Sequence, residues 1–144
     1  MTLDSHRAYR RQLRSKPEIP LDVLYVEDDV VNIRVTELLL SRLGYDLDIA
    51  RNGEEAVKAA AEKAYDLILM DLHMPVMDGL EAAIKILENH VPPQKKRRPV
   101  LLALTSTSSN EERDAWLDAG MDGFLNKPFK TSDFQEVIKR HFIS

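Results

Sequence analysis

The chain has 144 residues, 44% of them hydrophobic and 31% charged, which is typical of one folded domain and argues against a disordered protein. The absence of cysteine excludes disulfide bonds and thiolate metal sites. No apolar run approaches the roughly 18 residues of a membrane-spanning helix, and residues 5–16 are too polar and basic for a secretory signal. We therefore expect a cytoplasmic protein without membrane insertion.

Charge is unevenly distributed along the chain. Residues 1–20 carry five basic against two acidic side chains, so a net charge of −4 for the whole chain leaves −7 for the rest. An acidic body argues against direct nucleic-acid binding, which depends on basic groups that neutralise phosphates. Pro17 and Pro20 end any helix in the tail, because proline lacks a backbone donor and favours extended geometry before it. We expect 1–20 to be a basic N-terminal extension or linker and 21–144 to form the domain.

Beyond the tail, short apolar runs alternate with segments of helical periodicity. The runs are rich in β-branched and aromatic residues and predict strands at 21–26, 45–50, 66–70, 100–104 and 124–125. Helices are predicted at 31–43, 53–63, 80–89, 110–119 and 131–142. Gly44 and Gly120 stand where glycine commonly ends a helix, and Thr131 or Ser132 would cap the last one.

This alternation of five strands and five helices predicts an α/β fold with a parallel sheet covered by helices on both faces. The third strand is continuously apolar from Leu67 to Met70, as expected of a strand buried on both faces. Right-handed crossovers favour a doubly wound sheet, whose ligand sites lie beyond the carboxyl ends of its strands. The residues that follow each strand are therefore the candidates for a site.

Acidic residues follow two of the predicted strands. Glu27, Asp28 and Asp29 come after the first strand, and Asp71 ends the third. If these strands are adjacent, their carboxylates share one crevice, and two carboxylates about 4 Å apart repel by roughly 4 kcal/mol at an effective dielectric of about 20. A hard divalent cation would relieve this repulsion, and all-oxygen ligation by few protein groups is typical of Mg²⁺. Taken alone, the run of acids favours a solvated loop, and its place beside Asp71 at the end of an apolar strand reverses that preference.

A hydroxyl and an ammonium are predicted at the same edge of the sheet. Thr105 and Ser106 follow the fourth strand, and Lys127 follows the fifth. Phosphoryl transfer depends mainly on positioning and on neutralising charge over the phosphoryl oxygens. A carboxylate nucleophile at Asp71, surrounded by Mg²⁺, a hydroxyl and a lysine, would supply those elements. Singly, Thr105 and Lys127 are ordinary strand-end and surface residues.

Four segments resemble the receiver domains of two-component response regulators and hybrid histidine kinases. They are VLYVEDD at 23–29, MDLHMPVMDG at 70–79, LTS at 104–106 and KPF at 127–129, and the resemblance covers about residues 21–142. It implies a flavodoxin-like (βα)5 fold with a doubly wound five-stranded parallel sheet in the order 2-1-3-4-5. It also implies that the chain is not an enzyme but a phosphoacceptor that assists its own phosphorylation and dephosphorylation, either alone or within a hybrid histidine kinase.

The resemblance also implies roles for the acidic residues. Asp71 is the phosphoacceptor and a ligand of Mg²⁺, Asp28 binds the metal directly, and Glu27 acts mainly through a bound water. His73 contributes its backbone carbonyl to the metal. His73 and Thr107 flank the site at positions that tune the lifetime of the phosphoryl group. No cofactor besides Mg²⁺ is expected.

Further roles fall on the fourth and fifth strands. By the same resemblance, Thr105 hydrogen-bonds the phosphoryl group and Lys127 pairs with it. The peptide bond before Pro128 is expected to be cis. Phe124 matches the switch aromatic of the family, which turns inward as the hydroxyl at Thr105 shifts, so that phosphorylation changes an interaction surface.

The expected partners are a histidine kinase or histidine phosphotransfer protein as phosphodonor and a downstream effector protein. Two other hypotheses stay open. A Mg²⁺-dependent phosphohydrolase with an aspartate nucleophile needs an acid two residues after Asp71, where the sequence has His73. A receiver-like interaction module that is never phosphorylated typically lacks one of the site residues. A nucleotide or flavin site is disfavoured because no glycine-rich phosphate loop is present.

Overall fold

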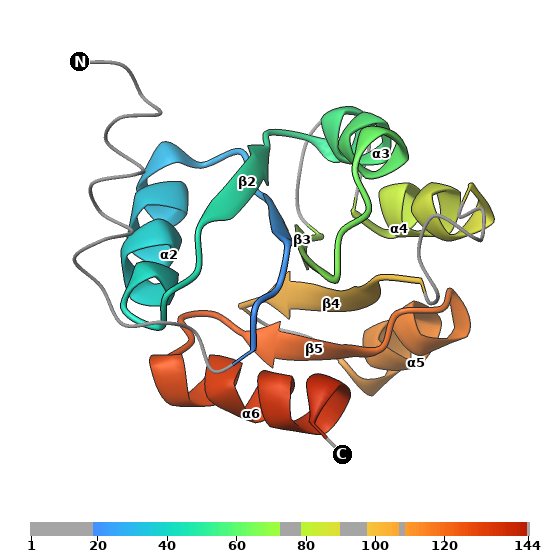
Figure 1. Cartoon of the computed structure of the whole chain (residues 1–144). Helices are drawn as coiled ribbons and strands as arrows, with labels where there is room; N and C mark the ends of the chain where they lie inside the picture. Colours follow the sequence, from blue (N-terminus) through green and yellow to red (C-terminus); the bar gives the residue numbers. More distant parts are fainter. Residues whose placement is uncertain (1–18, 73–78, 90–97, 107–108, 144) are drawn as a thin grey trace.

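The computed structural model describes residues 19–72, 79–89, 98–106 and 109–143. Strands and helices alternate along these residues (Figure 1). The strands are β1 (Val23–Val26), β2 (Leu47–Ala50), β3 (Leu67–Asp71), β4 (Val100–Thr105) and β5 (Gly123–Asn126). The helices are α2 (Val30–Ser41), α3 (Gly53–Glu62), α4 (Gly79–Glu88), α5 (Asn110–Asp118) and α6 (Thr131–Phe142). Every predicted boundary lies within two residues of these.

The strands form one parallel sheet in the order β2-β1-β3-β4-β5. Helices α2 and α6 cover one face, and α3, α4 and α5 cover the other (Figure 1). This arrangement confirms the predicted α/β, doubly wound, flavodoxin-like topology. In the sheet register, Val26 lies beside Met70, Asp71 beside Leu104, and Thr105 beside Asn126. The carboxyl ends of β1, β3, β4 and β5 therefore lie along one edge.

Strand β3 is central to both layers of the core. Its five residues are all buried, and alternate side chains enter opposite hydrophobic clusters. Leu67 and Leu69 pack toward α2 and α6, whereas Ile68 and Met70 pack toward α3, α4 and α5. Because both faces are covered, every position before Asp71 must be apolar, as the sequence pattern indicated.

Helix α2 presents apolar residues to solvent. Its buried residues are Ile33, Thr36 and Leu40. Three other apolar residues face outward, with Val31 68%, Val35 57% and Leu38 61% exposed. The helix carries apolar residues on most of its circumference, so spacing alone could not identify the face that packs on the sheet.

The helix ends follow the sequence expectation in two places and depart from it in a third. Gly44 has φ 93° and Gly120 has φ 103°, the left-handed conformation in which glycine ends helices at little cost. The expected cap at Thr131 or Ser132 is wrong, because the N-cap of α6 is Lys130. The backbone N–H of Lys130 donates to Asp133 Oδ2 at 2.8 Å, so the side chain that caps this helix end lies inside its first turn.

Arg98, at the end of the basic stretch 95–98, is not a free surface charge. Its guanidinium forms two hydrogen bonds with the Asp122 carboxylate, at 2.7 and 3.0 Å. Asp122 Oδ2 also accepts from the backbone N–H of Leu101 at 2.8 Å. This ion pair ties the start of β4 to the start of β5, and residues 95–97 lie outside the described residues.

We expect Leu69→Ala to lower the free energy of unfolding by about 2–5 kcal/mol, because the substitution opens a cavity in a close-packed core. Leu117→Ala is the matched control, since Leu117 is 48% exposed and should change stability by less than about 0.5 kcal/mol. Urea denaturation followed by circular dichroism measures both. Equal losses for the two variants would contradict the central role of β3.

Candidate functional site

Three carboxylates converge at the carboxyl edge of the sheet. Glu27 and Asp28 follow β1, and Asp71 ends β3. One oxygen of each lies within 4.8 Å of an oxygen of the other two. Glu27 and Asp71 are only 1% and 5% exposed, whereas Asp28 is more open to solvent. Sheet register alone brings these groups together, because β1 and β3 are adjacent and end side by side.

The Lys127 ammonium lies between two of these carboxylates. Its Nζ is 3.0 Å from Glu27 Oε1 and 3.3 Å from Asp71 Oδ2. Burial opposes ionisation of Glu27, yet hydrogen bonds within the cluster and the charge of Lys127 outweigh it and lower the pKa of this carboxyl to about 2. One ammonium among three acidic side chains leaves the site short of positive charge. The arrangement therefore suits a further cation.

Backbone contacts place Lys127 at this edge. Its N–H donates to the carbonyl oxygen of Thr105 at 2.8 Å, which extends the pairing of β4 and β5 by one step. Thr105 itself is fully buried at the end of β4. The Lys127–Pro128 peptide bond is cis, as expected from the sequence. Thr105 and Lys127 thus reach the edge at which the acidic residues converge.

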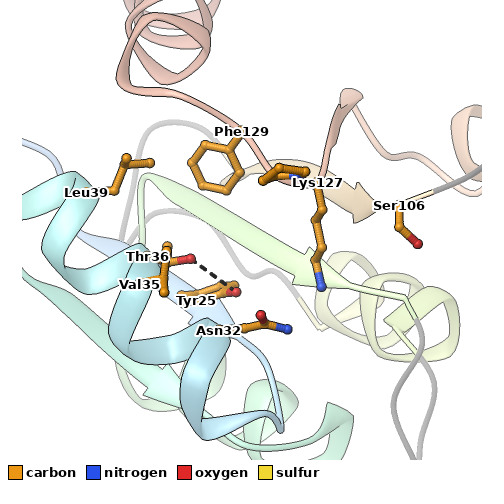
Figure 2. A pocket seen from close by; sticks show the side chains of 9 residues that line it. Tyr25, Asn32, Val35, Thr36, Leu39, Ser106, Lys127 and Phe129 are labelled. Carbon is orange, nitrogen blue, oxygen red and sulfur yellow. Dashed lines mark hydrogen bonds between the residues drawn. The ribbon is translucent and has the colours of Figure 1, made fainter.

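A buried tyrosine that was not singled out from the sequence contacts the acidic cluster from the hydrophobic core. The Tyr25 hydroxyl donates to Glu27 Oε1 at 3.1 Å. It accepts from Thr36 Oγ1 at 3.4 Å (Figure 2). Burial, together with the neighbouring Glu27 charge, raises the pKa of Tyr25, so it stays a neutral donor. A signal for this contact was present in the sequence, since residues two apart on a strand share a face.

A pocket of about 290 Å³ opens beside the cluster. Helix α2 forms one wall with Val35 and Leu39, and the loop after β5 forms the other with Pro128 and Phe129 (Figure 2). Lys127 lines this pocket (Figure 2) and also pairs with Glu27 and Asp71. An apolar recess therefore adjoins a charged site.

Phe124 on β5 is half-buried and held by two side chains of α5. The Trp116 ring meets it edge-on, with the ring centroids 6.3 Å apart, and the Arg113 guanidinium carbon lies 4.2 Å from its centroid. Its ring thus has partners on the helix that covers this part of the sheet. His73 and Thr107, the two remaining residues singled out from the sequence, lie outside the described residues.

Gly79 allows α4 to start against the end of β3. A Cβ at this position would lie 2.6 Å from the carbonyl oxygen of Asp71 and 2.9 Å from Leu72 Cα. Both are backbone atoms that cannot move aside cheaply. In the sequence Gly79 was only the last residue of the segment at 70–79, but its missing side chain sets how closely α4 approaches Asp71.

A family model for the response regulator receiver domain matches residues 23–139. The chain belongs to the response regulator receiver domain family. Among curated relatives, hybrid signal transduction histidine kinase B of Dictyostelium discoideum is 46% identical over 127 residues, and probable histidine kinase 1 of Oryza sativa subsp. indica is 35% identical over 147. Each match covers 83% of this chain but only 6% and 15% of the relatives, so the chain spans a small part of their length.

Solved receiver domains have the same architecture. The receiver domain of sensor histidine kinase PA1611 from Pseudomonas aeruginosa, crystallised with a magnesium ion in its active site cleft, is 36% identical with a TM-score of 0.74. That match covers 88% of this chain and 100% of the other. The Saccharomyces cerevisiae Ssk1 receiver domain, crystallised with the histidine phosphotransfer protein Ypd1, is 32% identical with a TM-score of 0.73, over 88% and 90% of the two chains. Receiver domains act in two-component phosphorelay signalling, and this chain is one of them.

Within the described part of this receiver domain, no helix is both long and apolar enough to cross a bilayer.

We expect Gly79→Ala to lower the free energy of unfolding by about 1–3 kcal/mol, because the added methyl group overpacks the contact between α4 and the backbone of Asp71. Gly123→Ala is the control, since its Cβ would meet Leu102 Cδ2 at an ordinary 3.4 Å. Urea denaturation of both variants tests this. If Gly79→Ala is as stable as Gly123→Ala, α4 can move away from the end of β3 without a loss of stability, which would contradict this prediction.

Proposed function

We propose that this receiver domain accepts a phosphoryl group on Asp71 from a histidine phosphodonor, in a reaction that depends on Mg²⁺. The observation that carries the proposal is the convergence of three carboxylates and Lys127 at one edge of the sheet. A carboxylate oxygen of Asp71 would attack the phosphorus, and the P–N bond to the donor histidine would break. The electron pair of that bond leaves with the imidazole nitrogen, so no further reactant is needed.

The donor set fits Mg²⁺. Glu27, Asp28 and Asp71 offer only oxygen atoms, and the partial exposure of Asp28 leaves room for the waters that this ion retains. We propose that Asp28 and Asp71 hold the ion directly and Glu27 through water, with the fourth contact from the carbonyl of His73. Bound Mg²⁺ would neutralise charge on the phosphoryl oxygens. The magnesium ion in the cleft of the Pseudomonas relative supports this assignment.

Two residues would hold the transferred group. Lys127 lies 3.3 Å from Asp71, close enough to pair with a phosphoryl group attached there. Thr105 ends the neighbouring strand, and we assign its hydroxyl to a hydrogen bond with the same group. We further propose that its movement lets Phe124 turn inward and changes the surface that an effector protein recognises. The contacts of Phe124 with α5 would then be broken or remade.

The phosphodonor would dock over α2 and the adjoining pocket. A donor histidine must approach Asp71 from solvent, and α2 begins immediately after the acidic residues that follow β1. The exposed Val31, Val35 and Leu38 continue the apolar lining of the pocket, with the exposed Arg34 and Arg42 beside them. A partner that presents apolar side chains within an acidic rim would fit. The complex of Ypd1 with the yeast relative supports a histidine phosphotransfer protein in this role.

The wider context of the domain also stays a proposal. We assign 21–144 to the receiver and 1–20 to a basic extension, and we regard the chain as a phosphoacceptor rather than an enzyme. The relatives suggest a place within a hybrid histidine kinase, although a regulator that acts alone is compatible with the same domain. The cytoplasmic location and the lack of nucleic-acid binding stay predictions. The phosphohydrolase hypothesis depends on His73, which lies outside the described residues, and no contact of the described residues favours it.

Incubation with acetyl phosphate and Mg²⁺ should add one phosphoryl group to the wild-type protein. Asp71→Asn should add none, because the amide is not a competent nucleophile. Intact-protein mass spectrometry measures the adduct, with omission of Mg²⁺ as a further arm. Asp114→Asn is the matched control, since Asp114 is an exposed residue of α5 and should behave as wild type.

A wild-type protein that is folded and binds Mg²⁺ but gains no adduct, even with a phosphorylated histidine protein, would refute the proposed function. An adduct that survives in Asp71→Asn would place the phosphoryl group elsewhere. Either result would favour an interaction module that is not phosphorylated at this site.

Val35→Asp and Leu38→Asp should slow phosphoryl transfer from phosphorylated Ypd1, used as the test donor, by about tenfold or more. Each variant puts a charge into an apolar contact and should weaken docking. Their phosphorylation by acetyl phosphate should be unchanged, because neither residue touches the acidic cluster. Leu117→Asp, on α5 at the other face of the sheet, is the control. Equal slowing with both donors would contradict a docking role for α2.

A further inference from the structure

Tyr25 is a buried residue whose hydroxyl the proposed chemistry does not yet use. Its side chain is 1% exposed in the middle of β1, surrounded by the cluster that α2 and α6 pack against. An apolar side chain would satisfy the packing at this position. A buried hydroxyl costs free energy unless it is hydrogen-bonded. The hydroxyl of Tyr25 is bonded on both sides, and one of its two partners belongs to the acidic site.

The hydrogen bonds of Tyr25 have a defined direction. Thr36 on α2 donates to the Tyr25 hydroxyl oxygen, which leaves the hydrogen of Tyr25 available for Glu27. Figure 2 shows Thr36 and Tyr25 side by side, with Asn32 one turn earlier on the same helix. Thr36 of helix α2 thus fixes the orientation of the Tyr25 hydroxyl, which donates its hydrogen to Glu27. Strand geometry favours this contact, because residues two apart project from the same face.

Glu27 is held by donors on both of its oxygens. Oε1 accepts from Tyr25 at 3.1 Å and from Lys127 at 3.0 Å, while Oε2 accepts from the backbone N–H of Asp28 at 3.2 Å. Lys127 is shared with Asp71 and would be drawn toward a phosphoryl group. The other partner of the Tyr25 hydroxyl is the hydroxyl of Thr36 rather than a second acidic group. Tyr25 would therefore keep its hold on Glu27 when Lys127 leaves.

We propose that Tyr25 is a positioning residue, which holds the Glu27 carboxylate in the orientation needed for the divalent cation, and that Thr36 orients Tyr25. This inference rests on the proposed Mg²⁺ site. Tyr25 acts through Glu27 and touches neither the metal nor the phosphoryl group. Groups that orient metal ligands in this way commonly change metal affinity by about tenfold or more when they are removed.

The test is Tyr25→Phe, which removes only the hydroxyl. We expect the dissociation constant for Mg²⁺, measured by titration of backbone NMR signals near the site, to rise by about tenfold. Tyr65→Phe is the matched control. Tyr65 is also buried and also donates to a carboxylate, Asp48 Oδ2 at 2.7 Å, but it packs on the other face of the sheet. That variant should lose stability without a change in Mg²⁺ affinity.

A double-mutant cycle separates positioning from a general effect on the fold. In a Glu27→Gln background, Tyr25→Phe should have little further effect on Mg²⁺ affinity, because its target is already altered. An unchanged Mg²⁺ affinity in Tyr25→Phe, or an equal loss in both backgrounds, would overturn the inference. If Tyr25→Phe does not fold, Thr36→Val tests the same link, and wild-type affinity in that variant overturns the role of Thr36 and Tyr25 together.

The two proposals fail in different ways. If the wild-type protein binds no Mg²⁺ in the same titration, the proposed metal site is wrong and the role of Tyr25 falls with it. If the wild-type protein binds Mg²⁺ and gains a phosphoryl group, but Tyr25→Phe binds the ion equally well, only the role of Tyr25 is wrong.

Discussion

Three carboxylates at one edge of the sheet repel one another, and the folded core holds them together in spite of that repulsion. Two such groups about 4 Å apart repel by roughly 4 kcal/mol at an effective dielectric of about 20, and burial of Glu27 and Asp71 reduces the screening by water. The backbone cannot relax this strain, because β1 and β3 are fixed by pairing and by two hydrophobic layers. Lys127 offsets part of the charge. The core thus stabilises an edge that retains affinity for a cation.

The rigidity of that edge comes from contacts of different range. Strand pairing aligns the chain ends, the close start of α4 at Gly79 fixes the backbone of Asp71, and the hydroxyl of Tyr25 orients Glu27 from within the core. Each contact acts on a different atom of the site. If phosphorylation shifts Thr105 and Phe124 as we propose, a firmly held acidic edge would direct that change to β4, β5 and α5 rather than to the site itself.

Much of the site was predictable because it follows strand ends. Once five apolar runs were identified, Glu27, Asp71 and Lys127 had to meet wherever a doubly wound sheet placed those ends together. Tyr25 and the outward face of α2 were not predictable in the same way. A tyrosine in a buried strand resembles any aromatic core residue until its hydroxyl is located, and a helix that is apolar on most sides gives no periodic signal for its packed face. Tertiary contacts decided both.

The contact between Phe124 and Trp116 offers a way to follow the state of this domain by fluorescence. The chain has a single tryptophan, Trp116, and its ring rests edge-on against Phe124 while Arg113 covers the Phe124 ring. Indole emission depends on the polarity and charge immediately around it. Any rotation of the Phe124 ring would alter both for Trp116. The unlabelled protein therefore contains its own optical reporter, placed beside the residue whose rotation we propose to accompany phosphorylation.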